Sequence, residues 1–266
     1  MRNILVLIHD DAGQESRLLA AVDLVRALGG RLTCLDVAVA PPPLIGFTDF
    51  ELRSTAITMA RAQESRNRAA IEPRLVASGI SYQWIDVLGF IAESVCEAAS
   101  PAELIVVSRK LDASYPDMRE AAGAVLIDSG KPIVAMPETG RGFNVTGHAL
   151  IAWDGSPAAD KALQAAVPLL RLAGAVTLAS LDDGSIRLPI GAAAAYLGRY
   201  DIRCDIRHER CRHGEAGPAL LDMIATLDAA WLVMGGFGHS RLVEGVFGGV
   251  TRRMLGACPV PLFLAH

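Results

Sequence analysis

The sequence predicts an α/β protein of two tandem doubly wound domains, each with a five-stranded, mainly parallel sheet flanked by helices. Two observations predict it: the halves of the chain repeat each other, and each half alternates short apolar runs with helix-like segments. The apolar runs lack clean polar alternation, which indicates strands buried on both faces. With 266 residues the chain is long enough for two ordinary domains.

The repeat can be followed at both ends of the halves. The openings RNILVLIHDD and GHALIAWDGS place Asp10 opposite Asp154, an offset of 144 residues. Near the ends of the halves, Pro132 aligns with Pro259, an offset of 127. The first offset exceeds the second by 17, so the first half carries 17 additional residues. The two halves are therefore versions of one unit.

The additional residues fall in the middle of the first half, where a proline-rich loop precedes a long helical segment. Residues 48–51 (TDFE) offer a capping box at the start of that helix. The glycine- and proline-containing segment PETGRGFNVTG, at residues 137–147, is typical of a linker. We therefore expect one domain at residues 1–140 and a second at 147–266.

The elements of the second half follow from the same patterns. The expected strands are ALIAW, AVTLASL, IRCDIRH, AAWLVMG and VPLFLA, and the helices are expected to begin near Ser156, Gly191, Gly217 and Val250. In doubly wound sheets, ligands bind outside the carboxyl ends of the strands. Asp154 and the glycines after Met234 both follow strand ends, so we expect them at one edge of the sheet.

The composition excludes several classes of protein. The net charge is −4 and Lys and Arg are scattered among Asp and Glu, so no nucleic-acid partner is expected. No apolar run suits a signal peptide or a membrane span. The cysteines are odd in number and lack paired spacing, which favours reduced thiols and a cytoplasmic protein; they are Cys34, Cys96, Cys204, Cys211 and Cys258.

The glycine-rich segment MGGFGHSRLVEGVFGGVTRR is the strongest functional signal. Gly235 and Gly238 follow a strand, and Gly248 and Gly249 precede a helix that begins near Val250. Free amides at a helix N-terminus and the helix dipole favour an anion, so the segment suits a phosphate. A structural turn followed by a helix start is the alternative interpretation.

The G-2x-G-9x-G pattern, the aspartate closing the first strand and the repeated five-strand unit resemble the universal stress protein (UspA-like) family in its tandem form. The resemblance implies an adenine nucleotide alpha hydrolase-like fold and a regulatory, non-enzymatic module of the stress response. It implies ATP or AMP as ligand, with Mg²⁺ if the ligand is ATP. Carried over, the binding residues are Asp154, Gly235, Gly238, Gly248 and Gly249, with Trp153, Met234 and Val250 as neighbours.

Two departures from the family pattern affect this expectation. Gly249 stands where the family has Ser or Thr, which removes one hydrogen bond, about 1 to 3 kcal/mol or roughly five- to a hundred-fold in affinity. Thr251 offers a replacement hydroxyl or a helix cap. In the first half the glycines are replaced by residues with side chains, so that half is expected to be a degenerate partner domain; the replacements are Ser108, Leu111, Ala121 and Ala122.

Other motifs give weaker evidence of function. The His and Cys residues of the segment 204–213 match no common zinc spacing, so no metal site is expected. Asp10, without a glycine loop beside it, is expected to cap a turn. Weak ATPase activity is an open alternative, for which Asp154 and Glu244 are the nearby carboxylates.

The last strands expected in the two halves, KPIVAMP and PVPLFLAH, are apolar and would each lie at an edge of a sheet. An unpaired apolar edge invites association, so we expect the halves to pair along these strands as an internal pseudo-dimer. A homodimer, or a purely structural module with an empty glycine loop, stays open.

Overall fold

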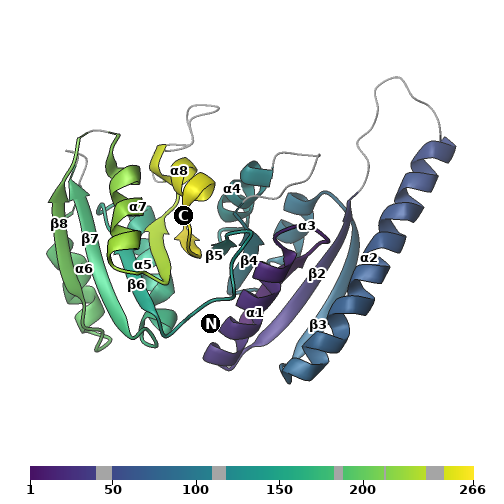
Figure 1. The fold of residues 1–266 in the computed structure, drawn as a ribbon, viewed down its shortest axis with the longest axis horizontal. Coiled ribbons are helices and arrows are strands. Elements are labelled where there is room, and N and C mark those ends of the chain that lie inside the picture. The colour runs from purple at the N-terminus through teal and green to yellow at the C-terminus, as the bar shows by residue number, and fades with distance from the viewer. Residues whose placement is uncertain (40–49, 110–117, 183–187, 213, 238–248) are drawn as a thin grey trace.

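The computed structural model describes residues 1–39, 50–109, 118–182, 188–212, 214–237 and 249–266 (Figure 1). The first half contains β1 (Asn3–Ile8), α1 (Gln14–Leu28), β2 (Arg31–Val39), α2 (Phe50–Ser78), β3 (Tyr82–Gly89), α3 (Ile91–Ala98), β4 (Leu104–Ser108), α4 (Met118–Ser129) and β5 (Ile133–Met136). The second contains β6 (His148–Ala152), α5 (Pro157–Leu170), β7 (Ala175–Asp182), α6 (Ile190–Gly198), β8 (Asp205–Arg210), α7 (Ala216–Thr226), β9 (Trp231–Gly235), α8 (Gly249–Ala257) and β10 (Leu262–Ala265).

The predicted α/β alternation is confirmed, and the strands form one ten-stranded sheet rather than two separate ones. Its order is β3-β2-β1-β4-β5-β10-β9-β6-β7-β8. Neighbouring strands within each half are parallel, whereas β5 and β10 are antiparallel, with Val134 opposite Phe263. The last strands of the two halves thus cover each other's edge, and the sheet twists so that the strands of the two halves lean in opposite directions (Figure 1).

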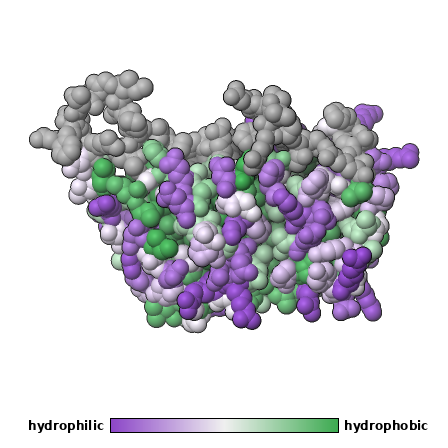
Figure 2. Space-filling view, turned by 180° about the vertical axis from the view of Figure 1, so that it is seen from behind, coloured by the Kyte–Doolittle hydropathy of each residue, from purple (hydrophilic) through white to green (hydrophobic). Residues whose placement is uncertain are grey.

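Two layers of helices sandwich this sheet. One buried apolar cluster joins the sheet to α1, α2, α5 and α6, and the other joins it to α3, α4, α7 and α8. Both clusters contain residues of both halves, so each core continues across the β5–β10 joint. On the side opposite to that of Figure 1, hydrophilic side chains are spread over both halves with smaller apolar areas between them (Figure 2).

Element boundaries agree closely with the sequence patterns, with one exception. The four helices of the second half begin within one residue of the predicted positions. The strand predicted at IRCDIRH begins instead at Asp205, because the chain leaves α6 through a left-handed Asp201 (φ 60°) and Ile202 packs into the core. The Ile202 amide also donates to Leu197 O, which completes the end of α6.

The additional residues of the first half lie where the sequence places them. Helix α2 has 29 residues and α6, at the corresponding place in the second half, has 9. Residues 48 and 49 of the predicted capping box lie outside the described residues.

The segment predicted as a linker is packed against both halves. Phe143 is buried, and the centroid of its ring lies 5.3 Å from the ring centroid of Trp231 in the second half. Its amide donates to Asp23 of α1 at 2.9 Å. The segment therefore fills a place in the core that continues from one half to the other.

The described residues give two further facts. None of their helices has the length and apolar character needed to cross a bilayer. None of their cysteines is joined in a disulfide.

Candidate functional site

The site predicted in the second half begins where two neighbouring strands end. Strands β6 and β9 are parallel neighbours, with Ala152 opposite Met234. Trp153 and Asp154 follow β6, and Gly235 is the last residue of β9. The predicted convergence of these segments on one sheet edge is therefore confirmed.

The first turn of α8 returns to the same edge. The amide of Phe237, two residues after β9, donates to Thr251 Oγ1 at 3.4 Å. Gly249 and Val250 precede Thr251 in this turn, so they also lie near the end of β9. Gly238 and Gly248 lie outside the described residues.

Asp154 forms the turn that leads into α5. Its Oδ1 accepts from the Ser156 amide at 2.9 Å, and Ser156 in turn caps α5 by accepting from the Ala159 amide at 3.1 Å. Gly155 between them has φ +71°, and an added Cβ would lie 2.2 Å from the amide nitrogen of Leu188. This turn therefore requires glycine, and the residue leading toward α6 closes over it.

Two predicted neighbours of the ligand point into the cores. Trp153 is 4% exposed and packs in one apolar cluster, while Met234 is 6% exposed and packs in the other. The indole N–H of Trp153 donates to Leu188 O at 3.3 Å. Their side chains therefore shape the sheet edge by packing beneath it.

The glycines at the two ends of the segment have different surroundings. A Cβ on Gly235 would lie 2.5 Å from the amide nitrogen of Ala159 and 2.7 Å from the carbonyl carbon of Ala158, so this glycine lets α5 approach β9. A Cβ on Gly249 would have no described heavy atom within 4 Å. Packing explains Gly235, whereas a side chain at Gly249 would meet none of the described residues.

Thr251 does not cap α8, and its role as a replacement hydroxyl for the ligand stays a prediction. It is 5% exposed, and its hydroxyl accepts from the Phe237 amide. Phe237 itself has φ +56°, which is unusual for a residue with a Cβ. The hydroxyl thus stabilises the left-handed backbone that carries the chain away from β9.

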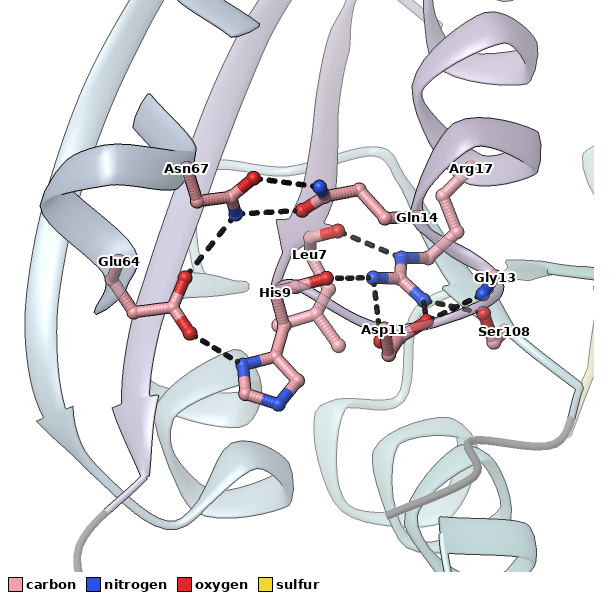
Figure 3. Close-up of polar contacts among 9 residues, drawn as sticks. All are labelled: Leu7, His9, Asp11, Gly13, Gln14, Arg17, Glu64, Asn67 and Ser108. Carbon is pink, nitrogen blue, oxygen red and sulfur yellow. Dashed lines mark hydrogen bonds and ion pairs between the residues drawn. The ribbon is translucent and has the colours of Figure 1, made fainter. Parts of the chain in front are cut away.

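In the first half, the strand ends that correspond to Asp154 and Gly235 are joined by an arginine that the sequence patterns did not single out (Figure 3). Arg17 of α1 is fully buried, and its guanidinium donates to the carbonyls of Leu7 and His9, both at 2.9 Å. It also donates to Ser108 Oγ at 2.5 Å and to both carboxylate oxygens of Asp11, at 2.9 and 3.0 Å. Every nitrogen of the guanidinium is therefore paired within the protein.

The carboxylate that corresponds to Asp154 in its turn is Asp11, not Asp10. Asp11 Oδ1 accepts from the amide of Gly13, two residues ahead, just as Asp154 accepts from that of Ser156. The prediction that Asp10 caps this turn is wrong, because its carboxylate accepts instead from a glutamine of α2. Asp11 takes this position because it, and not Asp10, forms the ion pair with the Arg17 guanidinium.

The predicted loss of glycines in the first half has a structural counterpart. Ser108 ends β4, as Gly235 ends β9, and its hydroxyl lies against Arg17. Ala122 is buried and Ala121 is partly buried in α4, while Leu111 lies outside the described residues; the four replacements are those named from the sequence.

A second polar cluster lies beside Arg17, under α2 (Figure 3). His9 Nδ1 lies 2.9 Å from Glu64 Oε1, and Asn67 donates to the other oxygen of Glu64 at 3.2 Å. Asn67 and Gln14 exchange two hydrogen bonds of 2.7 and 2.8 Å. These contacts fasten α2 to the carboxyl end of β1 and the start of α1.

Asp36 of β2 is the most buried acid of this region. It is 2% exposed, and its Oδ1 has no hydrogen-bond partner among the described residues. Burial raises the pKa of Asp36 to about 8, and the neighbouring carboxylates of Glu64 and Asp86 add to the rise, which Arg68 partly opposes. The sequence held one signal for this, an acid inside the apolar strand RLTCLDVAV.

Among the described residues, no three His, Cys, Asp or Glu side chains are grouped so that they could hold a metal. His208, from the segment considered for zinc, lies on β8, whose residues are all exposed. His213 lies outside the described residues.

Comparisons with known proteins find relatives of the second half by sequence and of the whole chain by structure. The model of the universal stress protein family matches residues 146–266. A universal stress protein from Archaeoglobus fulgidus DSM 4304 superposes with a TM-score of 0.73 at 17% identity, covering 99% of this chain and 95% of that chain. A protein of unknown function from Pseudomonas aeruginosa PAO1 gives a TM-score of 0.58 at 16% identity, covering 100% and 92%.

At these identities the structural likeness concerns the fold alone, and no curated protein sequence matches the chain. The family model covers the half with the glycine-rich segment, and the solved structures cover both halves. The second half of this chain therefore belongs to the universal stress protein family, and the chain as a whole has the tandem universal stress protein fold.

Proposed function

We propose that this universal stress protein is a regulatory module that binds one adenine nucleotide, ATP or AMP, in its second half. When ATP is bound, Mg²⁺ would accompany the phosphates. The observation that carries the proposal is the meeting of three segments at one sheet edge: the Asp154 turn after β6, the end of β9 and the first turn of α8. The residues proposed to face the ligand are Asp154, Gly235, Gly238, Gly248, Gly249 and Val250.

The proposed phosphate position is the N-terminus of α8. The first amides of a helix have no partners within the helix, and they and the helix dipole attract an anion. This placement is supported by Gly249, where an added Cβ would have no described atom within 4 Å. Asp154 would lie toward the nucleoside, with the carboxylate held by the Ser156 amide.

The proposal assigns no nucleotide to the first half. Ser108 and Asp11, the counterparts of Gly235 and Asp154, are engaged by the buried guanidinium of Arg17. A nucleotide there would have to displace an arginine whose partners are all protein atoms. This half would act as a partner domain.

Two other functions stay as alternatives. Hydrolysis of ATP would need a carboxylate that holds the metal, and Asp154 Oδ1 already accepts from an amide. A structural module without ligand is favoured by the packing of Gly235 against α5, because that glycine needs no nucleotide to explain it. We place regulation by nucleotide binding ahead of both because packing against the described residues does not explain Gly249.

Calorimetry with ATP, ADP and AMP on the full chain tests the proposal, with three substitutions of Gly249. Serine would restore a hydroxyl beside the phosphate and strengthen binding by roughly five- to a hundred-fold. Aspartate suits the first turn of a helix but repels a phosphate, so Gly249→Asp should fold normally and abolish binding. Gly249→Ala is the matched control, which should bind like the wild type.

The outcomes separate the functions. Heat from the wild type that grows in Gly249→Ser and vanishes in Gly249→Asp supports the proposed site. Binding that is indifferent to all three substitutions would place the ligand elsewhere. No heat from either the wild type or Gly249→Ser would leave the structural module, and phosphate release that Asp154→Ala stops would favour the ATPase.

A further inference from the structure

Arg109, the residue after β4 in the first half, contacts the far end of helix α8 in the second half. Its Nη1 donates to Leu255 O at 3.1 Å and reaches Met254 O at 3.5 Å. Met254 O already accepts from the Cys258 amide at 2.9 Å, whereas Leu255 O lies in the last turn of α8, where carbonyl groups lack amide partners within the helix. A cation at this end of a helix is favourable.

The position of Arg109 is costly in the absence of such a partner. Burial lowers the pKa of the guanidinium, which the charges of Cys258 and Glu138 only partly offset. Its Nε and the Oε1 of Glu138 are both buried without a hydrogen-bond partner among the described residues. The hydrogen bonds to α8 are therefore the interactions that compensate a partly desolvated cation.

The first half touches the glycine-rich segment at its other end as well. A Cβ added to Gly236 would lie 2.5 Å from Cδ2 of Leu126 in α4, so Leu126 packs directly on the backbone that leaves β9. The Gly236 amide donates to Ala265 O, which fixes that backbone to β10. Helices α4 and α8 lie near each other above the joint of the two halves (Figure 1).

We propose that Arg109 is a positioning residue through which the first half holds α8, and hence the phosphate-binding amides, in place. The inference rests on the proposed nucleotide site. Helix α8 has nine residues, about 13 Å from end to end, so a shift at its last turn is transmitted to its first. The first half, which lacks the glycines of the proposed phosphate site, would in this way support the phosphate site of the second half.

The test compares Arg109→Met and Arg109→Lys in the full chain with Arg74→Met, which breaks an exposed ion pair of the same half. Hydrogen exchange of the α8 amides and calorimetry with ATP are measured on each. Methionine keeps the aliphatic length but removes every donor, whereas lysine keeps the charge and loses the planar fork.

We expect Arg109→Met to speed exchange in α8 about tenfold and to weaken ATP binding by a similar factor, with exchange in α1 unchanged. Arg109→Lys should fall between this variant and the wild type, and Arg74→Met should match the wild type.

Equal changes in α1 and α8, or no change in α8, would overturn the positioning role. Faster exchange in α8 with unaltered ATP affinity would do the same. If the wild type binds no nucleotide, the proposed function fails, while exchange in α8 still decides whether Arg109 holds the helix.

Discussion

The buried carboxyl of Asp36 makes a quantitative prediction about stability and pH. An exposed aspartate has a pKa of 3.8, and in the folded chain that of Asp36 is about 8. Between these pH values the folded state holds a proton that the unfolded state has lost. The free energy of unfolding should therefore fall as the pH rises from about 4 to about 8 and level off above it.

The size of the fall follows from the surroundings of the carboxyl. Each tenfold change in an ionisation equilibrium is worth about 1.4 kcal/mol, which sets a ceiling of about 6 kcal/mol for this group. Glu64 and Asp86 face Asp36 with like charge, while Arg68 opposes them and His9 pairs with Glu64. Because these groups share the titration and the effective dielectric constant inside a protein is well above that of a dry interior, we expect a measured loss of about 2 to 3 kcal/mol.

Asp36→Asn isolates this contribution. Asparagine has nearly the same shape and no charge, so the variant should lack this part of the pH dependence and be about 2 kcal/mol more stable than the wild type near pH 9. Urea unfolding followed by tryptophan fluorescence at several pH values measures both. The matched control is Asp205→Asn on β8, an exposed strand at the other end of the sheet, which should leave the slope unchanged.

Parallel slopes for the wild type and Asp36→Asn between about pH 5 and pH 9 would refute the reasoning. They would mean that water or rearrangement of α2 relieves the repulsion within the folded state.

Two further predictions concern the strand ends. Arg17→Met leaves the buried Asp11 without its partner and should lower the free energy of unfolding by about 3 to 5 kcal/mol. Arg74→Met, which breaks an exposed ion pair, should change it by about 1 kcal/mol or less. Urea unfolding compares the two variants, and equal losses would contradict the stabilising role given to the buried Arg17 contacts. Gly235→Ala places a methyl group 2.5 Å from the backbone of α5 and should lower the free energy of unfolding by about 1 to 3 kcal/mol. In Gly249→Ala the methyl group meets no described atom, so this variant should be as stable as the wild type or slightly more stable. Thermal unfolding that ranks the two variants the other way would contradict the packing explanation.

Much of the fold could be predicted from the sequence because its signals are local. The repeat, the apolar runs and the helix starts depend on residues within one element, and the helices of the second half begin within a residue of their predicted positions. The adjacency of Asp154 and Gly235 also followed, since parallel strands bring their carboxyl ends to one edge. The strand at Asp205 was misplaced because Ile202 looks like a strand residue but ends a helix.

The sequence by itself therefore determined two related α/β halves, a longer helix in the first and an edge where a nucleotide site is expected. Only the tertiary structure decided what fills each strand end. Arg17 meets Ser108 across 91 residues and Arg109 meets Leu255 across 146. From the sequence alone, a charged residue is predicted to face solvent, because its burial requires partners that compensate the lost hydration. Here those partners are distant along the chain, so they leave no local pattern in the sequence.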